Sequence, residues 1–331
     1  MKKILVIQTA SIGDVVLATA LLEQLHSNFP DAKLDILVKK GIESLFEDHP
    51  FIGKVWIWNK RDKKYLNLLA LITEIREEKY DIVINVQRFL SSGLITLFSK
   101  AKQRIGFSKN PLSLFFTKRV KHLIDKDRFV HEIDRNYLLI EDICKREDKK
   151  YYPRLYPTKK SDAKMSEYKR GIYYTISAAS LWYTKQFHKQ GWIDFLSRVD
   201  KDSTIYLLGG ANDLVLCDEI KQSINHTKCI NLAGKLNFLE SCSLMREAKM
   251  NFTNDSAPLH FCSSVNAPIT AIFCCTTPEF GFTPLSDDSV IIQSELLLSC
   301  KPCGLHGYKQ CPKQHFNCSK TIDINKLVAR L

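Results

Sequence analysis

Short aliphatic runs alternate with amphipathic segments along the first half of the chain. The first run, residues 3–9, is rich in β-branched and aliphatic side chains, which is typical of a strand buried in a parallel sheet. Apolar residues then recur at helical spacing from Asp14 to Phe29. Because this alternation continues, the pattern predicts a doubly wound parallel α/β sheet. The further strands are expected at residues 34–38, 54–58, 80–86 and 103–107, and the further helices at residues 42–47, 65–78 and 130–144.

The pattern breaks between residues 145 and 170, where the chain is polar, contains Pro153 and Pro157, and shows no apolar period. We interpret this stretch as a linker between domains. A second alternating series follows, and 331 residues are enough for two cores. The sequence therefore predicts two Rossmann-like domains, residues 1–158 and residues 159–331. The second is expected to contain strands at residues 172–177, 203–208, 250–253 and 269–273, and helices near residues 192–199, 213–224 and 238–248.

A strand, a tight turn and a helix are expected across residues 250–264. Asn254, Asp255 and Ser256 are residue types that form turns and cap helices, and Pro258 suits a first helical turn. The free amides and the positive dipole end of such a helix attract phosphates. Asp255 would then suit ribose hydroxyls, while Ser256 and His260 would hold phosphates. The alternative is a well-capped helix that binds nothing.

Three other predicted strand ends carry polar residues that packing does not require. No Gly-x-Gly-x-x-Gly and no Walker lysine motif follows the first strand, so an NAD site or a P-loop is disfavoured. Asp14 is either a helix-start residue or a carboxylate at a cleft between the domains that accepts a proton. Lys185 is either a solvated surface group or a point charge for a diphosphate. The three strand ends are Ser11 to Asp14, Ala178 to Ser180 with Thr184 and Lys185, and Gly209 and Gly210 with Asp213.

The formal net charge of +12 is concentrated in residues 100–170, which hold 20 Lys and Arg against 10 Asp and Glu. Such a stretch suits nucleic acid, an acidic membrane surface or a phosphorylated substrate, unless it is only a solvated lysine-rich surface. It contains no recognisable nucleic-acid motif and no stacking platform, so we expect no nucleic-acid partner. The N-terminus does not resemble a signal peptide, and the longest later apolar run, residues 267–275, contains Pro268. We therefore expect a cytoplasmic protein.

Seven of the eleven cysteines lie scattered in apolar stretches, as expected for small buried hydrophobes in a reducing compartment. These seven are Cys144, Cys217, Cys229, Cys242, Cys262, Cys274 and Cys275. The other four crowd the C-terminus as a Cys-x2-Cys pair, Cys300 and Cys303, followed by Cys311 and Cys318. This spacing suits a structural zinc site or reduced, packed thiols. Both alternatives stay open, and we assign no metal.

Several motifs occur in a fixed order from residue 3 to about residue 325. They comprise residues 3–19, 80–87, 104–107, 180–185, 232–236, 254–256 with His260, and 277–278 with Gly281. In this order and spacing they resemble the motifs of glycosyltransferase family 9, the ADP-heptose–lipopolysaccharide heptosyltransferases.

The resemblance implies a GT-B architecture, two Rossmann-like domains facing an active-site cleft. It implies inverting transfer of a heptose, or a related sugar, from ADP-heptose to a phosphorylated, lipid-linked lipopolysaccharide core acceptor. No cofactor is required, because a helix N-terminus and a lysine stabilise the departing diphosphate. Asp14 would be the general base of this reaction. The residues expected to bind substrate or nucleotide are Ser11, Gly13, Ser180, Thr184, Lys185, Gly209, Gly210, Leu236 in the adenine pocket, Asp255, Ser256, Ala257 and His260.

The chain departs from the family pattern near the expected donor site. Ala257 stands where a glycine is usual, and residues 186–188 replace a basic-aromatic-proline sequence, with Trp192 coming late. These changes leave the sugar open. The alternatives are a transferase that uses another nucleotide sugar and a nucleotide-binding GT-B-like protein without transfer activity. We expect a monomer that acts at the anionic inner face of the cytoplasmic membrane.

Overall fold

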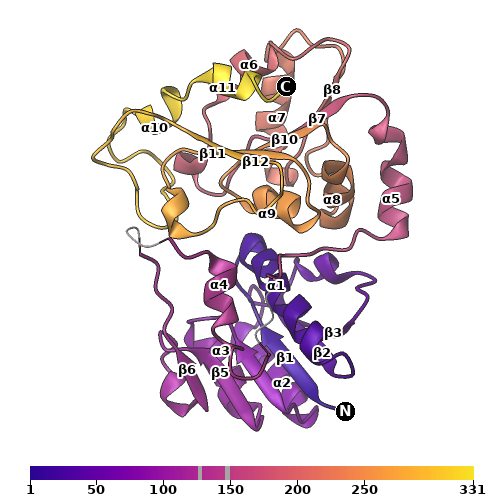
Figure 1. The fold of residues 1–331 in the computed structure, drawn as a ribbon, viewed down its shortest axis with the longest axis vertical. Coiled ribbons are helices and arrows are strands. Elements are labelled where there is room, and N and C mark those ends of the chain that lie inside the picture. Colours follow the sequence, from indigo (N-terminus) through magenta and orange to yellow (C-terminus); the bar gives the residue numbers. More distant parts are fainter. Residues whose placement is uncertain (126–128, 146–149) are drawn as a thin grey trace. The chain divides into compact units, whose positions relative to one another are not determined.

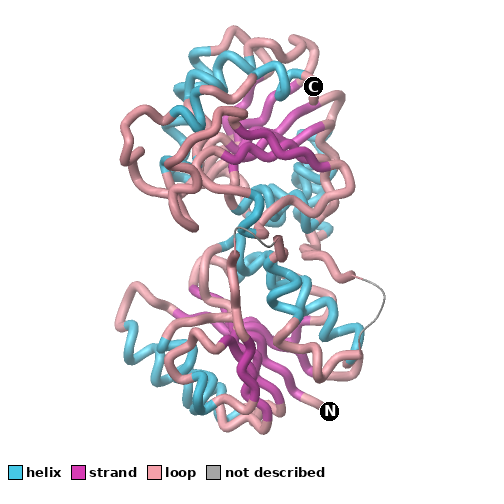
Figure 2. The backbone as a smooth tube through the Cα atoms, turned by 60° about the vertical axis from the view of Figure 1, so that its left-hand side comes forward, coloured by secondary structure: helices cyan, strands magenta, loops and turns pink. Residues whose placement is uncertain are grey.

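The computed structural model describes residues 1–125, 129–145 and 150–331, and the chain forms two compact units (Figure 1). Unit 1 contains residues 1–125 and 130–156, and unit 2 contains residues 157–331 together with Phe129. Each unit is built around one six-stranded parallel sheet, with helices packed on it (Figure 2). The predicted pair of doubly wound, Rossmann-like domains is confirmed. The division falls two residues before the predicted boundary at residue 158.

The sheet of unit 1 has the strand order β3-β2-β1-β4-β5-β6. The sequence runs outward from β1 to β3 and then returns to β4 beside β1, so the loops after β1 and β4 lie next to each other at the carboxyl edge. Both strands are almost wholly buried, because Ile4 to Ile7 and Ile82 to Ile84 are apolar on both faces. The strands are β1 (Lys3–Ile7), β2 (Lys33–Lys39), β3 (Ile52–Trp58), β4 (Ile82–Asn85), β5 (Gln103–Phe107) and β6 (Lys118–Val120). The helices are α1 (Ile12–Asn28), η1 (Glu43–Phe46), α2 (Lys64–Glu77), α3 (Leu90–Phe98), η2 (Ser113–Phe115) and α4 (Glu132–Tyr137).

Unit 2 repeats this topology with the order β12-β11-β10-β7-β8-β9. Its switch point lies between β7 and β10, so the loops after these two strands are neighbours. The strands are β7 (Tyr173–Ser177), β8 (Thr204–Leu207), β9 (Cys229–Asn231), β10 (Met250–Asn254), β11 (Ile269–Phe273) and β12 (Ser289–Gln293). The α-helices are α5 (Lys159–Met165), α6 (Lys189–Leu196), α7 (Leu214–Ser223), α8 (Phe238–Arg246), α9 (Ala257–Ser264), α10 (Asn317–Lys320) and α11 (Ile324–Val328), and the 3-10 turns are η3 (Ser166–Lys169), η4 (Tyr183–Lys185), η5 (Ala211–Asp213) and η6 (Pro278–Phe280).

The predicted linker is only partly correct. Residues 146–149 of that stretch lie outside the described residues, but α5 forms within it. The Thr158 hydroxyl accepts a hydrogen bond from the Ser161 amide at 3.0 Å and so caps this helix. Asp162 then accepts bonds from Ser243 and Arg246 of α8 at 2.6 and 2.9 Å. Polar contacts hold α5 in place, which explains why no apolar period marks it in the sequence.

Other predicted elements differ in length or type. The helix expected at residues 130–144 is a true helix only in α4, and the one expected at residues 42–47 is the 3-10 turn η1. The expected strands and helices omitted α3, β6, β9, β12, α10 and α11. Of these, β6, β9, α10 and α11 span only three to five residues, too few to show a clear period.

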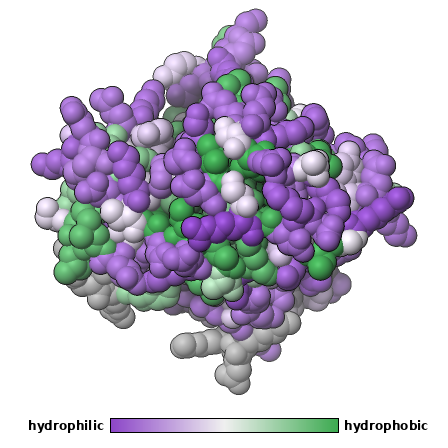
Figure 3. Space-filling model, turned by 90° about the horizontal axis from the view of Figure 1, so that it is seen from above, coloured by the Kyte–Doolittle hydropathy of each residue, from purple (hydrophilic) through white to green (hydrophobic). Residues whose placement is uncertain are grey.

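The seven scattered cysteines are buried, as expected, and all eleven are free thiols. Burial raises the pKa of Cys217 and of Cys242 to about 12, so both remain protonated and pack as apolar groups. The face of the molecule in Figure 3 is mainly hydrophilic, with small hydrophobic areas between the polar side chains. In the part of the chain that the structure describes, we find no helix with the length and apolar character needed to span a membrane.

Candidate functional site

The loop between β1 and α1 places Asp14 at the carboxyl edge of the unit 1 sheet. Ser11 is the N-cap residue, and its amide and hydroxyl both donate to Asp14 Oδ2, at 3.1 and 2.6 Å. Gly13 is buried in the first turn between them. The helix-start role of Asp14 is therefore real, and the same bonds orient its half-buried carboxylate at this edge.

Polar side chains fill the neighbouring strand ends. Gln87 donates through Nε2 to Gln8 Oε1, and its amide donates to Asn85 Oδ1 at 2.8 Å. Lys60, just after β3, donates through Nζ to the carbonyl and the hydroxyl of Thr9 at 2.7 and 3.1 Å. The sequence prediction missed Lys60, although it follows the carboxyl end of a predicted strand. A cation thus lies at the same sheet edge as the loop that carries Asp14.

The contribution of Lys60 to the stability of the folded chain depends on pH. Burial, followed by the neighbouring charges of Lys39 and Lys64, lowers the Lys60 pKa from 10.5 to about 8. Between these values the unfolded chain holds the proton that the folded chain has lost, so the contribution of Lys60 to stability rises with pH. We expect the wild type to gain stability relative to Lys60→Met as the pH rises from about 8 to about 10. Urea unfolding across this range measures the difference, with the exposed Lys40→Met as control. A pH-independent difference for Lys60→Met would contradict the assignment.

In unit 2, the β10–α9 turn has the predicted geometry. Ser256 is the N-cap of α9, and Pro258 lies in its first turn. The buried Asn254 ties this turn to the loop after β7, because its Nδ2 donates to the Ala178 carbonyl and its Oδ1 accepts from the Phe187 amide, both at 2.8 Å. Asn254 therefore positions the loop that carries Lys185.

Lys185 and Asp255 form an ion pair at the start of α9. Lys185 Nζ lies 2.7 Å from Asp255 Oδ2, and their side chains are only 16% and 6% exposed. The Thr276 hydroxyl donates to the same oxygen at 2.6 Å. The sequence assigned Asp255 to ribose hydroxyls and Lys185 to a diphosphate. In the structure the buried Asp255 carboxylate has Lys185 as its partner, and this cation offsets the cost of burying the negative charge.

Thr184, which was expected to bind substrate or nucleotide, forms hydrogen bonds with the C-terminal segment. Its hydroxyl accepts a hydrogen bond from the Tyr308 amide at 2.7 Å and lies 3.2 Å from the Tyr308 carbonyl. Its own amide donates to the same carbonyl at 3.1 Å. These bonds direct the buried side chain toward the C-terminal segment. Thr184 therefore anchors that segment beside Lys185.

The remaining predicted binding residues of unit 2 lie at or near strand ends. Ser180 is half-buried, and its carbonyl accepts from Gln186 Nε2 at 2.8 Å. The Gly210 amide is already bound to Asp213 Oδ2 at 2.8 Å, and a Cβ on Gly209 would lie 2.8 Å from Asp213 Cβ. These two glycines therefore allow the chain to pass close to the Asp213 side chain. Leu236 is half-buried before α8, Ala257 begins α9, and His260 is buried one turn later.

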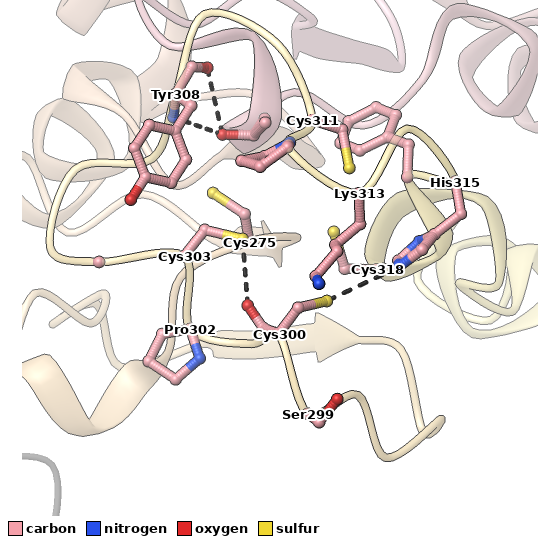
Figure 4. A pocket seen from close by; sticks show the side chains of 14 residues that line it. Cys275, Ser299, Cys300, Pro302, Cys303, Tyr308, Cys311, Lys313, His315 and Cys318 are labelled. Carbon is pink, nitrogen blue, oxygen red and sulfur yellow. Dashed lines mark hydrogen bonds between the residues drawn. The ribbon is translucent and has the colours of Figure 1, made fainter.

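The C-terminal cysteines line a cavity of about 320 Å³ (Figure 4). Cys300 Sγ lies 3.8 Å from His315 Nε2, and Cys303 Sγ donates to the Cys300 carbonyl at 3.2 Å. Burial raises the pKa of Cys318 to about 12. Within residues 1–125, 129–145 and 150–331, no three side chains of the types that bind metals are grouped to hold an ion.

Known proteins share both the sequence and the fold. The family model of glycosyltransferase family 9 (heptosyltransferase) matches residues 68–313. Lipopolysaccharide heptosyltransferase 3 of Escherichia coli is 26% identical over 301 residues, covering 84% of this chain and 85% of that protein.

Two solved structures match nearly the whole chain. The E. coli ADP-heptose lps heptosyltransferase II superposes with a TM-score of 0.78 at 20% identity, covering 100% of this chain and 98% of the other. The family 9 glycosyl transferase of Veillonella parvula superposes with a TM-score of 0.84 at 19% identity, covering 99% and 96%. These similarities confirm the predicted GT-B fold, and the family match establishes a glycosyltransferase. The chain belongs to glycosyltransferase family 9 (heptosyltransferase).

Proposed function

We propose that this enzyme transfers a heptose, or a related sugar, from an ADP-sugar to a lipopolysaccharide core acceptor. The observation that carries the proposal is the Lys185–Asp255 pair at the N-terminus of α9, in a chain of this family. A cation beside a helix N-terminus suits the diphosphate of a nucleotide sugar. The relatives named as lipopolysaccharide heptosyltransferases support heptose and a core acceptor.

In the proposed reaction, Asp14 takes the proton from an acceptor hydroxyl. The hydroxyl oxygen forms a bond to the anomeric carbon while the bond from that carbon to the diphosphate oxygen breaks, so the configuration inverts. Lys185 and the α9 dipole stabilise the negative charge on the departing ADP. Asp255 keeps Lys185 in position, and this role replaces direct ribose contact as our main assignment for it. Ser180, Ser256, the Ala257 amide and His260 complete the proposed phosphate and ribose site, with Leu236 beside the adenine.

A different nucleotide sugar is the alternative that a specific observation favours. Residues 186–188 depart from the family pattern, and they are held in the fold. Phe187 is buried, and the His188 amide donates to the Ser319 hydroxyl at 2.8 Å. These contacts fix the loop that carries Lys185, so the departure alters how this loop is held beside the proposed donor site.

Donor choice is tested by incubating the full chain with ADP-, GDP-, UDP- and dTDP-sugars and measuring release of the nucleotide diphosphate, with and without a core oligosaccharide acceptor. We expect ADP release from ADP-heptose that increases when the acceptor is added. Release from another nucleotide sugar alone would support the alternative transferase. Binding of ADP without any turnover would support a nucleotide-binding protein that has lost transfer activity.

We further propose that the protein acts in the cytoplasm as a monomer, peripheral to the inner face of the membrane, where a lipid-linked acceptor is accessible. The basic residues of unit 1 support this location, since anionic lipid headgroups attract lysine and arginine. Lys118 is not part of this attraction, because it pairs with Asp142 at 2.7 Å and lies 3.7 Å from Glu141. Arg119 and Lys121 are exposed, and we expect them to contribute to this attraction instead.

A further inference from the structure

Helix α3 is apolar on the side that faces solvent as well as on the side that packs. Its buried side includes Ile95 and Thr96. Leu90 and Phe98 are about half exposed on the opposite side, separated by two helical turns. Surface helices of soluble proteins normally present polar residues to water. The exposed apolar side of α3 is therefore a candidate binding surface.

The loop 108–116, which contacts the start of α3 through Asn110, adds two more exposed apolar side chains. Leu114 is 73% exposed and Phe115 is 59% exposed, both in η2. Asn110 holds this loop against the helix, since its Nδ2 donates to the Phe89 carbonyl at 3.0 Å. The approach is close, because a Cβ on Gly93 would lie 2.3 Å from Asn110 Oδ1. We call the five exposed residues the α3–η2 face: Phe89, Leu90, Phe98, Leu114 and Phe115.

The chain around this face is basic. No Asp or Glu occurs between Asp81 and Asp125, whereas eight Lys and Arg residues do. Five of the eight are exposed and form no ion pair with an acidic residue that the structure describes. These five are Arg88, Lys100, Lys109, Arg119 and Lys121.

Exposed apolar groups flanked by cations match the surface of an anionic bilayer, where the side chains enter the headgroup region and the cations meet phosphates. A second copy of the chain would bring an equally basic face against this one, and like charges repel. The charge therefore favours a bilayer over self-association.

We propose that the α3–η2 face docks unit 1 on an anionic membrane. This inference rests on the proposed function, since docking on the membrane serves an enzyme that acts on a lipid-linked acceptor. Helix α3 begins after β4 and α1 begins after β1, and these strands are neighbours in the parallel sheet. The start of α3, with Phe89 and Leu90, and the loop that carries Asp14 therefore lie at the same edge of the unit 1 sheet.

The test is sedimentation of the full chain with vesicles of phosphatidylglycerol and phosphatidylcholine, compared with phosphatidylcholine alone. The first variant is Leu114→Ser with Phe115→Ser, and the second is Arg119→Glu with Lys121→Glu. The matched control is Leu296→Ser with Leu297→Ser, an adjacent exposed pair in unit 2 of which Leu297 is 98% exposed. We expect both test variants to bind anionic vesicles at least about tenfold more weakly, while the control binds like the wild type. The effect of the charge reversal should shrink at high salt.

Unchanged vesicle binding by Leu114→Ser with Phe115→Ser would overturn the proposal, and so would an equal loss in the control. Sedimentation velocity without lipid tests whether a second copy of the chain binds this face instead. If the wild type is a dimer, and this variant is a monomer whose vesicle binding is unchanged, the face is a contact between two copies of the chain. ADP-heptose hydrolysis in solution is measured for the same proteins. Normal hydrolysis with lost vesicle binding supports docking, whereas absent hydrolysis with normal docking contradicts only the proposed function.

Discussion

Asp14→Asn is expected to lower kcat by about 10²–10⁴-fold and to leave the dissociation constant of the ADP-sugar unchanged. The asparagine oxygen still accepts a hydrogen bond from Ser11, so α1 keeps its N-terminal cap. It does not accept the acceptor's proton. Because the carboxylate acts on the acceptor, donor binding is spared. Steady-state kinetics and calorimetry with ADP measure the two quantities separately.

Asp323→Asn provides the matched control for this substitution. Asp323 also begins a helix, α11, and its Oδ1 accepts from the Asn325 amide at 2.9 Å. It should keep a near-normal kcat, because asparagine caps a helix almost as well as aspartate. A folded Asp14→Asn enzyme with near-normal kcat would show that Asp14 is a capping residue only.

Lys185→Met is expected to destabilise unit 2 and to weaken ADP binding about 10–100-fold. The substitution leaves the buried Asp255 carboxylate with Thr276 but without its cation. Removing one partner of a buried ion pair costs up to about 3–5 kcal/mol. Thermal unfolding and ADP calorimetry measure the two effects.

A double variant separates structure from binding. Lys185→Met with Asp255→Asn removes both charges, so much of the lost stability should return. ADP affinity should remain about 10–100-fold low, because the diphosphate still lacks its cation. Lys189→Met, an exposed lysine that pairs with Glu219, is the control for loss of a positive charge. Normal ADP affinity in the double variant would mean that the pair serves stability alone.

The two sheets were predictable from the sequence because their central strands are continuous aliphatic runs between helices of regular period. The edge strand β12 was missed because most of its residues are half-exposed. An edge strand with polar residues on either side does not show the long aliphatic run of a central strand. Helix α3 was missed because Ser91, Ser92 and Thr96 interrupt its apolar residues. Helix α5 depends on a cap and on polar contacts to α8, which no local period reveals.

The strand-end positions of the site were also predictable, but the partners of the side chains were not. Asp255 and Lys185 are 70 residues apart in the chain, and Thr184 reaches Tyr308 across 124 residues. The sequence marks each of these residues as polar at a loop. Only the folded chain shows that Asp255 binds Lys185 and that the Thr184 hydroxyl turns to the C-terminal segment.

Transfer itself is the measurement that tests the central claim most directly. The full chain is incubated with ADP-heptose and a lipopolysaccharide core acceptor, and the product is examined by mass spectrometry and NMR. We predict an acceptor that gains one heptose, with the anomeric configuration opposite to that of the donor and one ADP released for each transfer. An unmodified acceptor in the presence of folded, ADP-binding enzyme, or a product that retains the donor's configuration, would contradict the account.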